Sequence, residues 1–351
     1  MLESLIAQLA AVQPLAPEQV HQAVECLTTE AVPAPVKAAF LLALAEKGET
    51  PGEIAAFAAA LREKSVPVPL EQNWRESRAI LDIVGTGGDR LGTFNISTTS
   101  ALVCAAAGVA VAKHGNRAVT SQAGSADVLE ALGIRIDLSP AEAARSLREQ
   151  NFAFFFAPQF HPAFRHIAAA RKLCAERDRR TIFNLLGPLL NPARPSAMLM
   201  GVPGAAWCEP LATVLQSLGV RRGMVVAGKI GNQPAETANA LDELSTLGDT
   251  HVAEFYHERG FTASVLTREN FPLQPARLED LLGGDKFQNA EITRRILRGE
   301  DRGPKRDAVL LNAGAALFVA GAARSLAAGW DLAGETIDAG AATAKLAALA
   351  G

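Results

Sequence analysis

Three short segments between Asp82 and Gly133 combine glycine, hydroxyl and basic residues in patterns suited to binding anions. The first is Gly85-Thr86-Gly87-Gly88-Asp89, which directly follows the apolar run at residues 80–84. Glycines at the carboxyl end of a strand let backbone N–H groups approach a ligand, and open sheets bind ligands at that edge. The segment is neither the dinucleotide fingerprint nor a Walker loop, so it predicts an anion site of another kind.

The other two segments also lead from a loop into a helix. Residues 95–100 place hydroxyls and free N–H groups at a helix N-terminus, although an ordinary helix cap alone would explain them. The third segment offers charge from Lys113 and Arg117, and hydroxyls from Ser121 and Ser125, to phosphate oxygens. Isolated basic residues in loops are usually only solvated, but three such segments within about fifty residues indicate one shared anion site.

Length and charge limit the classes of protein that this chain can represent. It has 351 residues and a formal net charge of −3. Single hydrophobic cores tend to stop growing at about 250–300 residues, so we expect two domains, or one large domain with a helical appendage. The negative net charge gives no general attraction for a phosphate backbone, so we expect no nucleic-acid partner. The four cysteines form no Cys-x-x-Cys pair, no apolar run can span a bilayer, and the N-terminus resembles no signal peptide. These features predict a cytoplasmic protein without a zinc site.

The periodicity of apolar residues changes along the chain. Residues 2–64 are helical throughout, with a capping box at Thr50-Pro51-Gly52-Glu53, and the prolines at positions 67 and 69 form a linker. Short apolar runs then alternate with helices, which predicts a mostly parallel sheet covered by helices. The expected strands are residues 80–84, 109–112, 134–138, 152–157, 198–202 and 224–227. Residues 251–266 predict a hairpin around residues 258–260, and the C-terminal part is helical again.

In their order and spacing, the segments GTGGD, NIST, KHGNR and GSADVLEALG resemble the signature set of the anthranilate phosphoribosyltransferases. The resemblance continues through residues 154–165, 181–192 and 306–321, so it covers most of the chain. It implies an α/β protein of the nucleoside phosphorylase and phosphoribosyltransferase class, with a small all-helical N-terminal domain and a mostly parallel central sheet. The implied domains are residues 1–70, with a returning segment near 162–192, and residues 73–351.

The resemblance also implies a magnesium-dependent site for phosphoribosyl pyrophosphate. The residues implied for this donor are Gly85, Gly88, Asp89, Thr93, Asn95, Ile96, Ser97, Thr98, Lys113, His114, Gly115, Asn116, Arg117, Ala118, Val119, Thr120, Ser121 and Ser125. Those implied for Mg²⁺ are Ser97, Asp242 and Glu243. Adjacent carboxylates suit a hard cation that also binds substrate phosphates. Without the resemblance, Asp242 and Glu243 would count only as a solvated acidic pair.

For the aromatic acid, the resemblance implies Gly85, Asn116 and Arg171. A guanidinium can hold a carboxylate through two parallel hydrogen bonds, whereas without the resemblance Arg171 would only decorate a helix. The implied reaction, in tryptophan biosynthesis, is displacement of pyrophosphate from the ribose anomeric carbon by the aromatic amine. Because that amine is neutral at ordinary pH, we expect catalysis by position and charge and assign no catalytic base.

Three features depart from the usual pattern of the family. Ala227 stands where a histidine commonly ends the strand, residues 229–240 form a longer link, and residues 173–179 include a few extra positions. These changes fall near the acceptor and metal sides, so they leave open a related enzyme with another aromatic acceptor.

Two further alternatives disagree with the residues present. A pyrimidine nucleoside phosphorylase would carry Lys-x-Ser-Gly-Arg-Gly where residues 113–117 stand. A non-catalytic nucleic-acid-binding relative would show a basic groove and would lack the phosphate loops.

Family members are commonly homodimers, so the resemblance also implies a homodimer here.

Overall fold

The computed structural model describes residues 1–87, 89, 91–118, 122–231, 240–257 and 260–351. Its centre is a seven-stranded sheet in the order β3-β2-β1-β4-β5-β6-β7. The strands are β1 (Ile80–Gly85), β2 (Ala110–Gly115), β3 (Phe152–Phe156), β4 (Ala197–Gly201), β5 (Arg222–Gly228), β6 (Thr250–Tyr256) and β7 (Gly260–Leu266). Strands β1 to β5 run parallel, whereas β6 pairs antiparallel with β5 and β7 pairs antiparallel with β6. The predicted mostly parallel sheet is confirmed.

The expected hairpin is β6–β7, although its turn residues Glu258 and Arg259 lie outside the described residues. The strand expected at residues 134–138 is wrong. Ile134 and Ile136 are buried in alternation with exposed neighbours, yet the segment is not part of the described sheet. It carries the chain from α7 (Ser125–Ala131), on one face of the sheet, to α8 (Pro140–Gln150), on the other. The alternation therefore reflects a segment lying along the core and not a hydrogen-bonded ladder.

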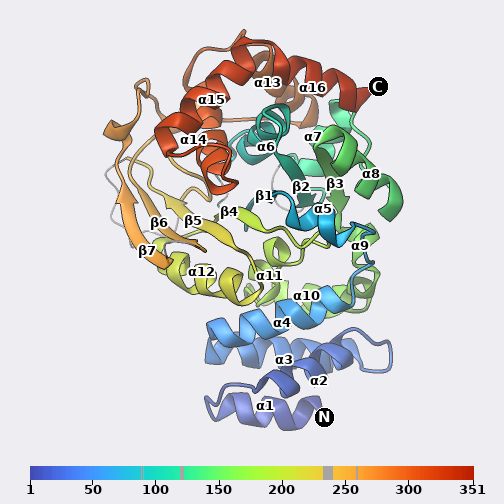
Figure 1. The fold of residues 1–351 in the computed structure, drawn as a ribbon. Helices are drawn as coiled ribbons and strands as arrows, with labels where there is room; N and C mark the ends of the chain where they lie inside the picture. The colour runs from blue at the N-terminus through green and yellow to red at the C-terminus, as the bar shows by residue number, and fades with distance from the viewer. Residues whose placement is uncertain (88, 90, 119–121, 232–239, 258–259) are drawn as a thin grey trace.

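Helices cover both faces of the sheet (Figure 1). One face packs against α6 (Ile96–Ala106), α13 (Lys286–Leu297), α14 (Pro304–Val319), α15 (Leu326–Asp338) and α16 (Ala341–Ala350). The other face packs against α8, α11 (Phe183–Leu189) and α12 (Cys208–Ser217). Successive side chains of a strand point to opposite faces, and accordingly Leu81 and Ile83 of β1 join the first core while Ile80 joins the opposite one.

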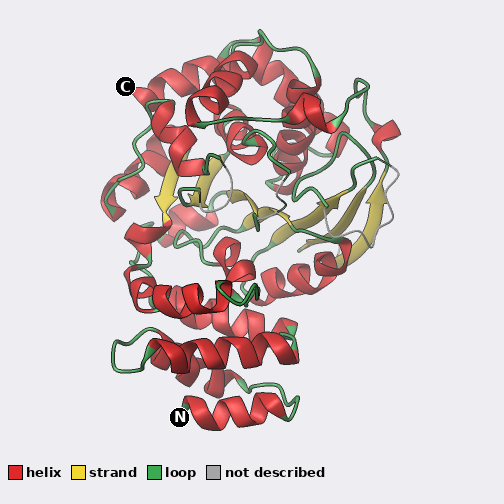
Figure 2. Cartoon of the chain, turned by 180° about the vertical axis from the view of Figure 1, so that it is seen from behind, coloured by secondary structure: helices red, strands yellow, loops and turns green. Residues whose placement is uncertain are grey.

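The N-terminal helices lie at the end of the molecule opposite the C-terminal helices (Figures 1 and 2). They are α1 (Leu2–Ala10), α2 (Pro17–Leu27), α3 (Ala34–Lys47) and α4 (Pro51–Glu63), followed by the short α5 (Gln72–Glu76). The predicted capping box is present, with Thr50 Oγ1 accepting from the N–H of Glu53 at 3.2 Å. After β3 and α9 (Ala157–Phe160), the chain returns to this end, where α10 (Ala168–Ala175) packs against α3 and α11 packs against α4. None of the helices within the described residues is long and apolar enough to cross a membrane.

Candidate active site

The carboxyl ends of the parallel strands meet at one edge of the sheet, and residues 241–245, which we call the acidic loop, rest on that edge. Three strands underneath it end in glycine, namely β1, β4 and β5 at Gly85, Gly201 and Gly228. A Cβ at Gly85 would lie 2.8 Å from Cγ of Asp242, and one at Gly228 would lie 2.7 Å from the carbonyl oxygen of Glu243. At Gly201 a Cβ would overlap the carbonyl oxygen of Asp242. These strands therefore end in glycine because the acidic loop lies directly on them.

Three elements fasten the acidic loop. Leu241 exchanges two backbone hydrogen bonds of 2.9 Å with Gly228 at the end of β5. Asn312 of α14 accepts from the N–H of Leu244 at 2.9 Å and donates to its carbonyl at 3.0 Å. The N–H of Ser245 donates to Oγ1 of Thr250 in β6 at 2.9 Å. The two carboxylates therefore project from a backbone that is held on several sides.

Both carboxylates of the acidic loop accept backbone hydrogen bonds from the predicted anion-binding segments. Oδ2 of Asp242 accepts from the N–H of Gly87 at 2.7 Å, and Oε1 of Glu243 accepts from the N–H of Ser97 at 3.1 Å. Burial, followed by the charge of nearby Asp89, raises the pKa of Asp242 to about 7. Burial and the charge of Asp242 raise the pKa of Glu243 to about 8. Burial and mutual repulsion make both carboxylates hard to ionise. A cation bound between them would stabilise their charged forms.

The donor set fits a divalent cation that is shared with a phosphorylated ligand. Mg²⁺ typically binds through one or two carboxylates, several waters and substrate phosphates, and not within a complete protein cage. Consistent with this, no group of three or more His, Cys, Asp or Glu side chains in the described part of the chain encloses a metal site by itself. Asp242 and Glu243 supply the carboxylates, and Ser97 lies beside them in the first turn of α6.

Lys113 brings a buried positive charge to the same place. Its side chain is 2% exposed, and its Nζ donates to the carbonyl of Ile83 at 2.8 Å and to Oγ of Ser97 at 3.4 Å. Burial lowers the pKa of Lys113, while the charges of Asp82 and Glu243 act in the opposite direction. In its ammonium form, Lys113 adds to the positive end of the α6 dipole, where an anion is favoured.

Helix α13 holds the N-terminus of α6 in place. The side-chain amide of Asn289 donates to Oδ1 of Asn95 at 2.9 Å, and the hydroxyls of Thr99 and Thr293 lie 2.9 Å apart. The buried hydroxyl of Thr98 has no hydrogen-bond partner among the described residues.

Two more residues of the predicted donor set lie on the loop that leads into α6. Thr93 forms an isolated β-bridge with Leu282, and Oδ1 of Asp89 accepts from the N–H of Leu91 at 3.2 Å. The bridge to Leu282 ties this loop to the body of the protein just before α6 begins, and the Asp89 bond closes a turn within the loop.

The third anion-suited segment folds against α7. A Cβ at Gly115 would overlap Oγ of Ser125, so these two predicted residues are in close contact. The guanidinium of Arg117 donates to Asp127 at 2.9 Å and to both carboxylate oxygens of Glu130 at 3.0 Å. Arg117 is thereby paired within its own segment.

The same segment keeps its turn through backbone groups. The N–H of Ala118 donates to Oδ2 of Asp127 at 2.9 Å, and the carbonyl of Asn116 accepts from the N–H of Ala126 at 3.3 Å. Among the predicted donor-site residues, Gly88, Val119, Thr120 and Ser121 lie outside the described residues.

A row of aromatic rings leads from the end of β2 to Arg171, one of the residues predicted for the acceptor. The ring of His114, at the end of β2, meets that of His161 edge-on with centroids 5.2 Å apart, and His161 stacks on Phe164 at 5.4 Å. Phe164 in turn meets Phe183, and the guanidinium of Arg171 lies 5.4 Å from the Phe183 centroid. Burial lowers the pKa of His114 to about 3 and that of His161 to about 4, so both imidazoles are neutral. Gly85 lies at the acidic loop, whereas Arg171 stands apart from that network on α10.

Several residues that shape the site were missed by the sequence analysis. Asn191 donates to the buried carboxylate of Asp82 at 2.8 Å, and burial raises the pKa of Asp82 to about 6. A charged residue within the apolar strand β1 was the available signal. Gly201 and Asn312 were also missed, although a glycine at a strand end and an amide inside an alanine-rich helix both stand out from their surroundings.

The three departures from the family pattern are partly visible. Ala227 is buried near the end of β5, and residues 232–239 of the longer link lie outside the described residues. The extra positions at 173–179 extend from the end of α10 into a turn in which Asp178 has a φ of 51°.

Comparison with known proteins places the chain in a family. The helical bundle domain of a glycosyl transferase family matches residues 3–65, and the α/β domain of that family matches residues 77–343. The anthranilate phosphoribosyltransferase of Lacticaseibacillus paracasei is 49% identical over 88% of this chain and 85% of that protein. That of Rubrobacter xylanophilus is 43% identical over 99% of this chain and 96% of that protein. This chain belongs to the anthranilate phosphoribosyltransferase family.

Solved structures of the anthranilate phosphoribosyltransferase family agree. The enzyme of Thermus thermophilus matches with a TM-score of 0.87 and 43% identity, covering 98% of each chain. The Saccharomyces cerevisiae enzyme, solved in complex with PRPP and Mg, matches with a TM-score of 0.86 and 26% identity over 99% of this chain and 96% of that chain. The expected resemblance and the expected fold, a helical N-terminal part with a large α/β part, are confirmed.

Proposed function

We propose that this chain transfers the phosphoribosyl group of 5-phosphoribosyl 1-pyrophosphate to anthranilate, giving N-(5-phosphoribosyl)anthranilate and pyrophosphate in tryptophan biosynthesis. The main structural support for this proposal is the acidic loop. Its two carboxylates accept hydrogen bonds from the N–H groups of Gly87 and Ser97 at the carboxyl ends of the strands. Relatives named for this activity match almost the whole chain. Neither alternative acceptor chemistry nor nucleic-acid binding is favoured by any feature of the described residues.

The donor binds at the glycine-rich loop, the N-terminus of α6 and the segment that follows β2. Backbone N–H groups and the ammonium of Lys113 are the groups that suit its phosphates. The hydrogen bond between Lys113 and Ser97 keeps that charge at the first turn of α6. We assign the donor to the full set of residues implied by the sequence resemblance.

Asp242, Glu243 and Ser97 are the residues that would hold Mg²⁺. Support comes from the raised pKa values of both carboxylates and from the yeast relative, whose structure contains PRPP and Mg. When bound, Mg²⁺ supplies positive charge that stabilises the leaving pyrophosphate.

In the reaction, the bond between the anomeric carbon and the pyrophosphate oxygen breaks, and pyrophosphate leaves with the electron pair. The amine nitrogen of anthranilate forms the new bond to that carbon and loses one proton to water. Arg171 holds the anthranilate carboxylate, and Gly85 and Asn116 are the other residues that we assign to the acceptor. Because the amine of anthranilate is already neutral, we infer that this chain contributes position and charge, and its low pKa makes His114 a weak base.

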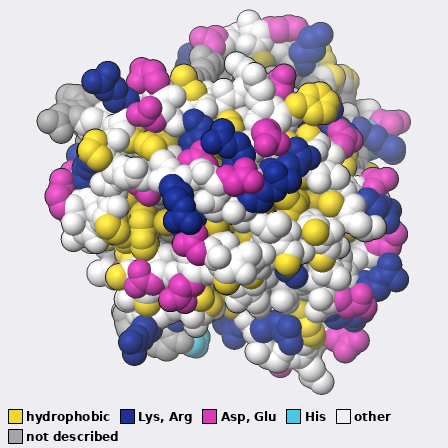
Figure 3. Space-filling view, turned by 90° about the horizontal axis from the view of Figure 1, so that it is seen from above, with side chains coloured by type: hydrophobic (Ala, Val, Ile, Leu, Met, Phe, Trp, Pro, Cys, Tyr) yellow, Lys and Arg dark blue, Asp and Glu magenta, His cyan; other side chains and the backbone are white. Residues whose placement is uncertain are grey.

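We further propose that the chain acts in the cytoplasm as a homodimer without a nucleic-acid partner. The face seen over the C-terminal helices mixes basic and acidic side chains (Figure 3), with ion pairs such as Arg294–Glu291 and Arg306–Asp338. A nucleic-acid-binding face would instead gather basic side chains of one sign.

The test is the decay of anthranilate fluorescence after the purified protein, phosphoribosyl pyrophosphate and Mg²⁺ are mixed, with a chelator control. We expect decay only with all components present, one pyrophosphate released per anthranilate consumed, and a product with the mass of phosphoribosylanthranilate. Donor binding without decay would contradict anthranilate as the acceptor.

A further inference from the structure

Two buried cations of the N-terminal helices hold the two ends of the returning segment. Lys37 of α3 is 2% exposed, and its Nζ donates to the carbonyl of His166 at 2.8 Å. Arg62 of α4 is 6% exposed, and its Nε donates to the carbonyl of Leu189 at 2.6 Å. His166 lies just before α10, and Leu189 is the last residue of α11. The segment between the two cations carries Arg171.

The contacts of Lys37 are directional and not merely space-filling. Its ammonium donates to the carbonyl of Thr29 at 2.5 Å as well as to that of His166. Burial lowers the pKa of Lys37, which reflects the cost of placing an ammonium inside an apolar cluster. An apolar side chain would fill that cluster without this cost, but it could not fix the position of either carbonyl group.

Helix α10 depends on its surroundings for its orientation. It has eight residues, and helices this short have little stability of their own in water. Lys37 anchors the chain at its start, and Cys174 near its end contacts the carbonyl of Ala38 through a weak S–H bond of 3.8 Å. The N–H of Arg171 donates to the carbonyl of Ile167, the residue that follows His166. The direction of the Arg171 guanidinium therefore follows from how α10 docks on α3.

We propose that Lys37 is a positioning residue for the acceptor. By holding the carbonyl of His166, it sets the place of α10 and so of Arg171, which receives the carboxylate of the aromatic acid. This inference rests on the proposed function. Arg62 also donates to the carbonyl of Leu218 on the α/β side, so its removal would disturb more than α10, and Lys37 is the cleaner residue to test.

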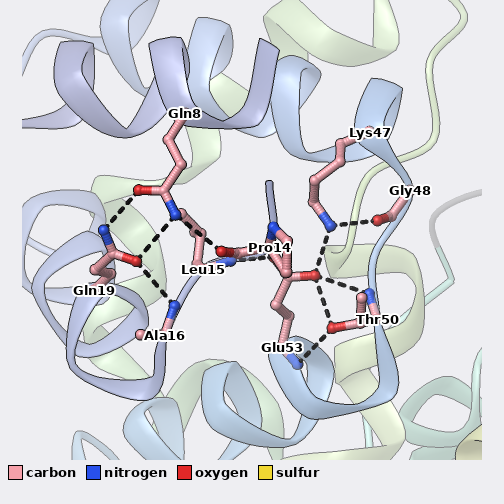
Figure 4. Close-up of polar contacts among 9 residues, drawn as sticks. All are labelled: Gln8, Pro14, Leu15, Ala16, Gln19, Lys47, Gly48, Thr50 and Glu53. Atoms are coloured by element: carbon pink, nitrogen blue, oxygen red, sulfur yellow. Dashed lines mark hydrogen bonds and ion pairs between the residues drawn. The ribbon is translucent and has the colours of Figure 1, made fainter. Parts of the chain in front are cut away.

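The chain offers a matched control in the same group of helices. Lys47 is paired with Glu53 at 2.7 Å, and their side chains are 3% and 1% exposed. Figure 4 shows that this pair joins α3 to the start of α4, with Glu53 also accepting from the N–H of Leu15 and from Thr50. These contacts do not involve the returning segment. The double variant Lys47→Met, Glu53→Gln therefore removes a buried lysine and leaves the bond from Lys37 to the carbonyl of His166 in place.

The experiment compares the full-length wild type, Lys37→Met and the control variant in the fluorescence assay. We expect Lys37→Met to raise KM for anthranilate about tenfold, because a misplaced Arg171 would lose about one charge-assisted hydrogen bond to the carboxylate. Its KM for phosphoribosyl pyrophosphate should stay within about twofold of wild type, as should both constants of the control. Hydrogen exchange provides a second readout, and the amide of Arg171 should exchange faster in Lys37→Met than in the control.

The proposal is overturned if KM for anthranilate is unchanged, or if the two KM values rise together. If Lys37→Met does not fold, Lys37→Leu, which also removes the donor to the carbonyl of His166, is subject to the same criteria. A wild type that leaves anthranilate untouched refutes the proposed function and this inference with it. An active wild type with an unaltered Lys37 variant refutes only the inference.

Discussion

A methyl group at the end of β4 should displace the acidic loop, which makes Gly201→Ala a direct test of how the site is built. The added Cβ would overlap the carbonyl oxygen of Asp242 and lie 3.0 Å from its Cα, whereas carbon atoms in contact stay about 3.5–4.0 Å apart. The carbonyl group of Asp242 must therefore move by more than about 1 Å to relieve the overlap. A shift of this size at reacting groups costs about a hundredfold in rate, and overpacking costs about 1–3 kcal/mol of stability.

The assay is kcat/KM at several Mg²⁺ concentrations, together with urea unfolding. Gly204→Ala is the matched control, since it lies three residues further along and a Cβ there would meet nothing within 4 Å. We expect kcat/KM to fall about a hundredfold in Gly201→Ala and to stay within about twofold in Gly204→Ala. A Gly201→Ala variant with wild-type kcat/KM would refute the idea that the loop must rest on these strand ends.

Three further predictions concern charge, support and the acceptor. Without metal, the native state keeps protons on Asp242 and Glu243 up to pKa values of about 7 and about 8, far above their values in the unfolded chain. The native state therefore binds more protons than the unfolded state from about pH 4 to 8. Tm should fall as the pH rises through this window, and Mg²⁺ should restore it. A Tm that does not change with pH would contradict the raised pKa values. Asn312→Ala leaves the buried N–H and carbonyl of Leu244 without their hydrogen-bond partner. It should lower the free energy of unfolding in urea by about 2 kcal/mol or more. A decrease below about 0.5 kcal/mol would contradict the idea that Asn312 supports the acidic loop. Arg171→Ala should raise KM for anthranilate at least about tenfold with little change in KM for the donor; equal effects on both substrates would remove its acceptor role.

The sheet and the donor side could be predicted because their signals are local. Parallel strands are buried on both faces and appear as apolar runs, as in the Phe152–Phe156 strand. A glycine-rich turn and a helix N-terminus likewise occupy contiguous residues. Residues 134–138 show the weakness of local patterns, since the same alternation arises wherever an extended segment lies along a core.

The support of the site could not be predicted because its contacts join distant parts of the chain. Gly87 and Asp242 are 155 positions apart, and Leu244 and Asn312 are 68 apart. No local pattern records such contacts, and only the family resemblance grouped Asp242 and Glu243 with Ser97. The division into residues 1–70, with the returning segment 162–192, and residues 73–351 stays a prediction, as do the individual roles of the site residues and the homodimer.

The most direct test of the account is the rate of anthranilate consumption by the Asp242→Ala, Glu243→Ala double variant as Mg²⁺ is varied, beside the wild type. We expect the wild type to depend on Mg²⁺ and the double variant to lose turnover severely, about a hundredfold or more, with an altered Mg²⁺ dependence. Wild-type rates and an unchanged Mg²⁺ dependence in the double variant would contradict the claim that the acidic loop forms the metal site for phosphoribosyl transfer.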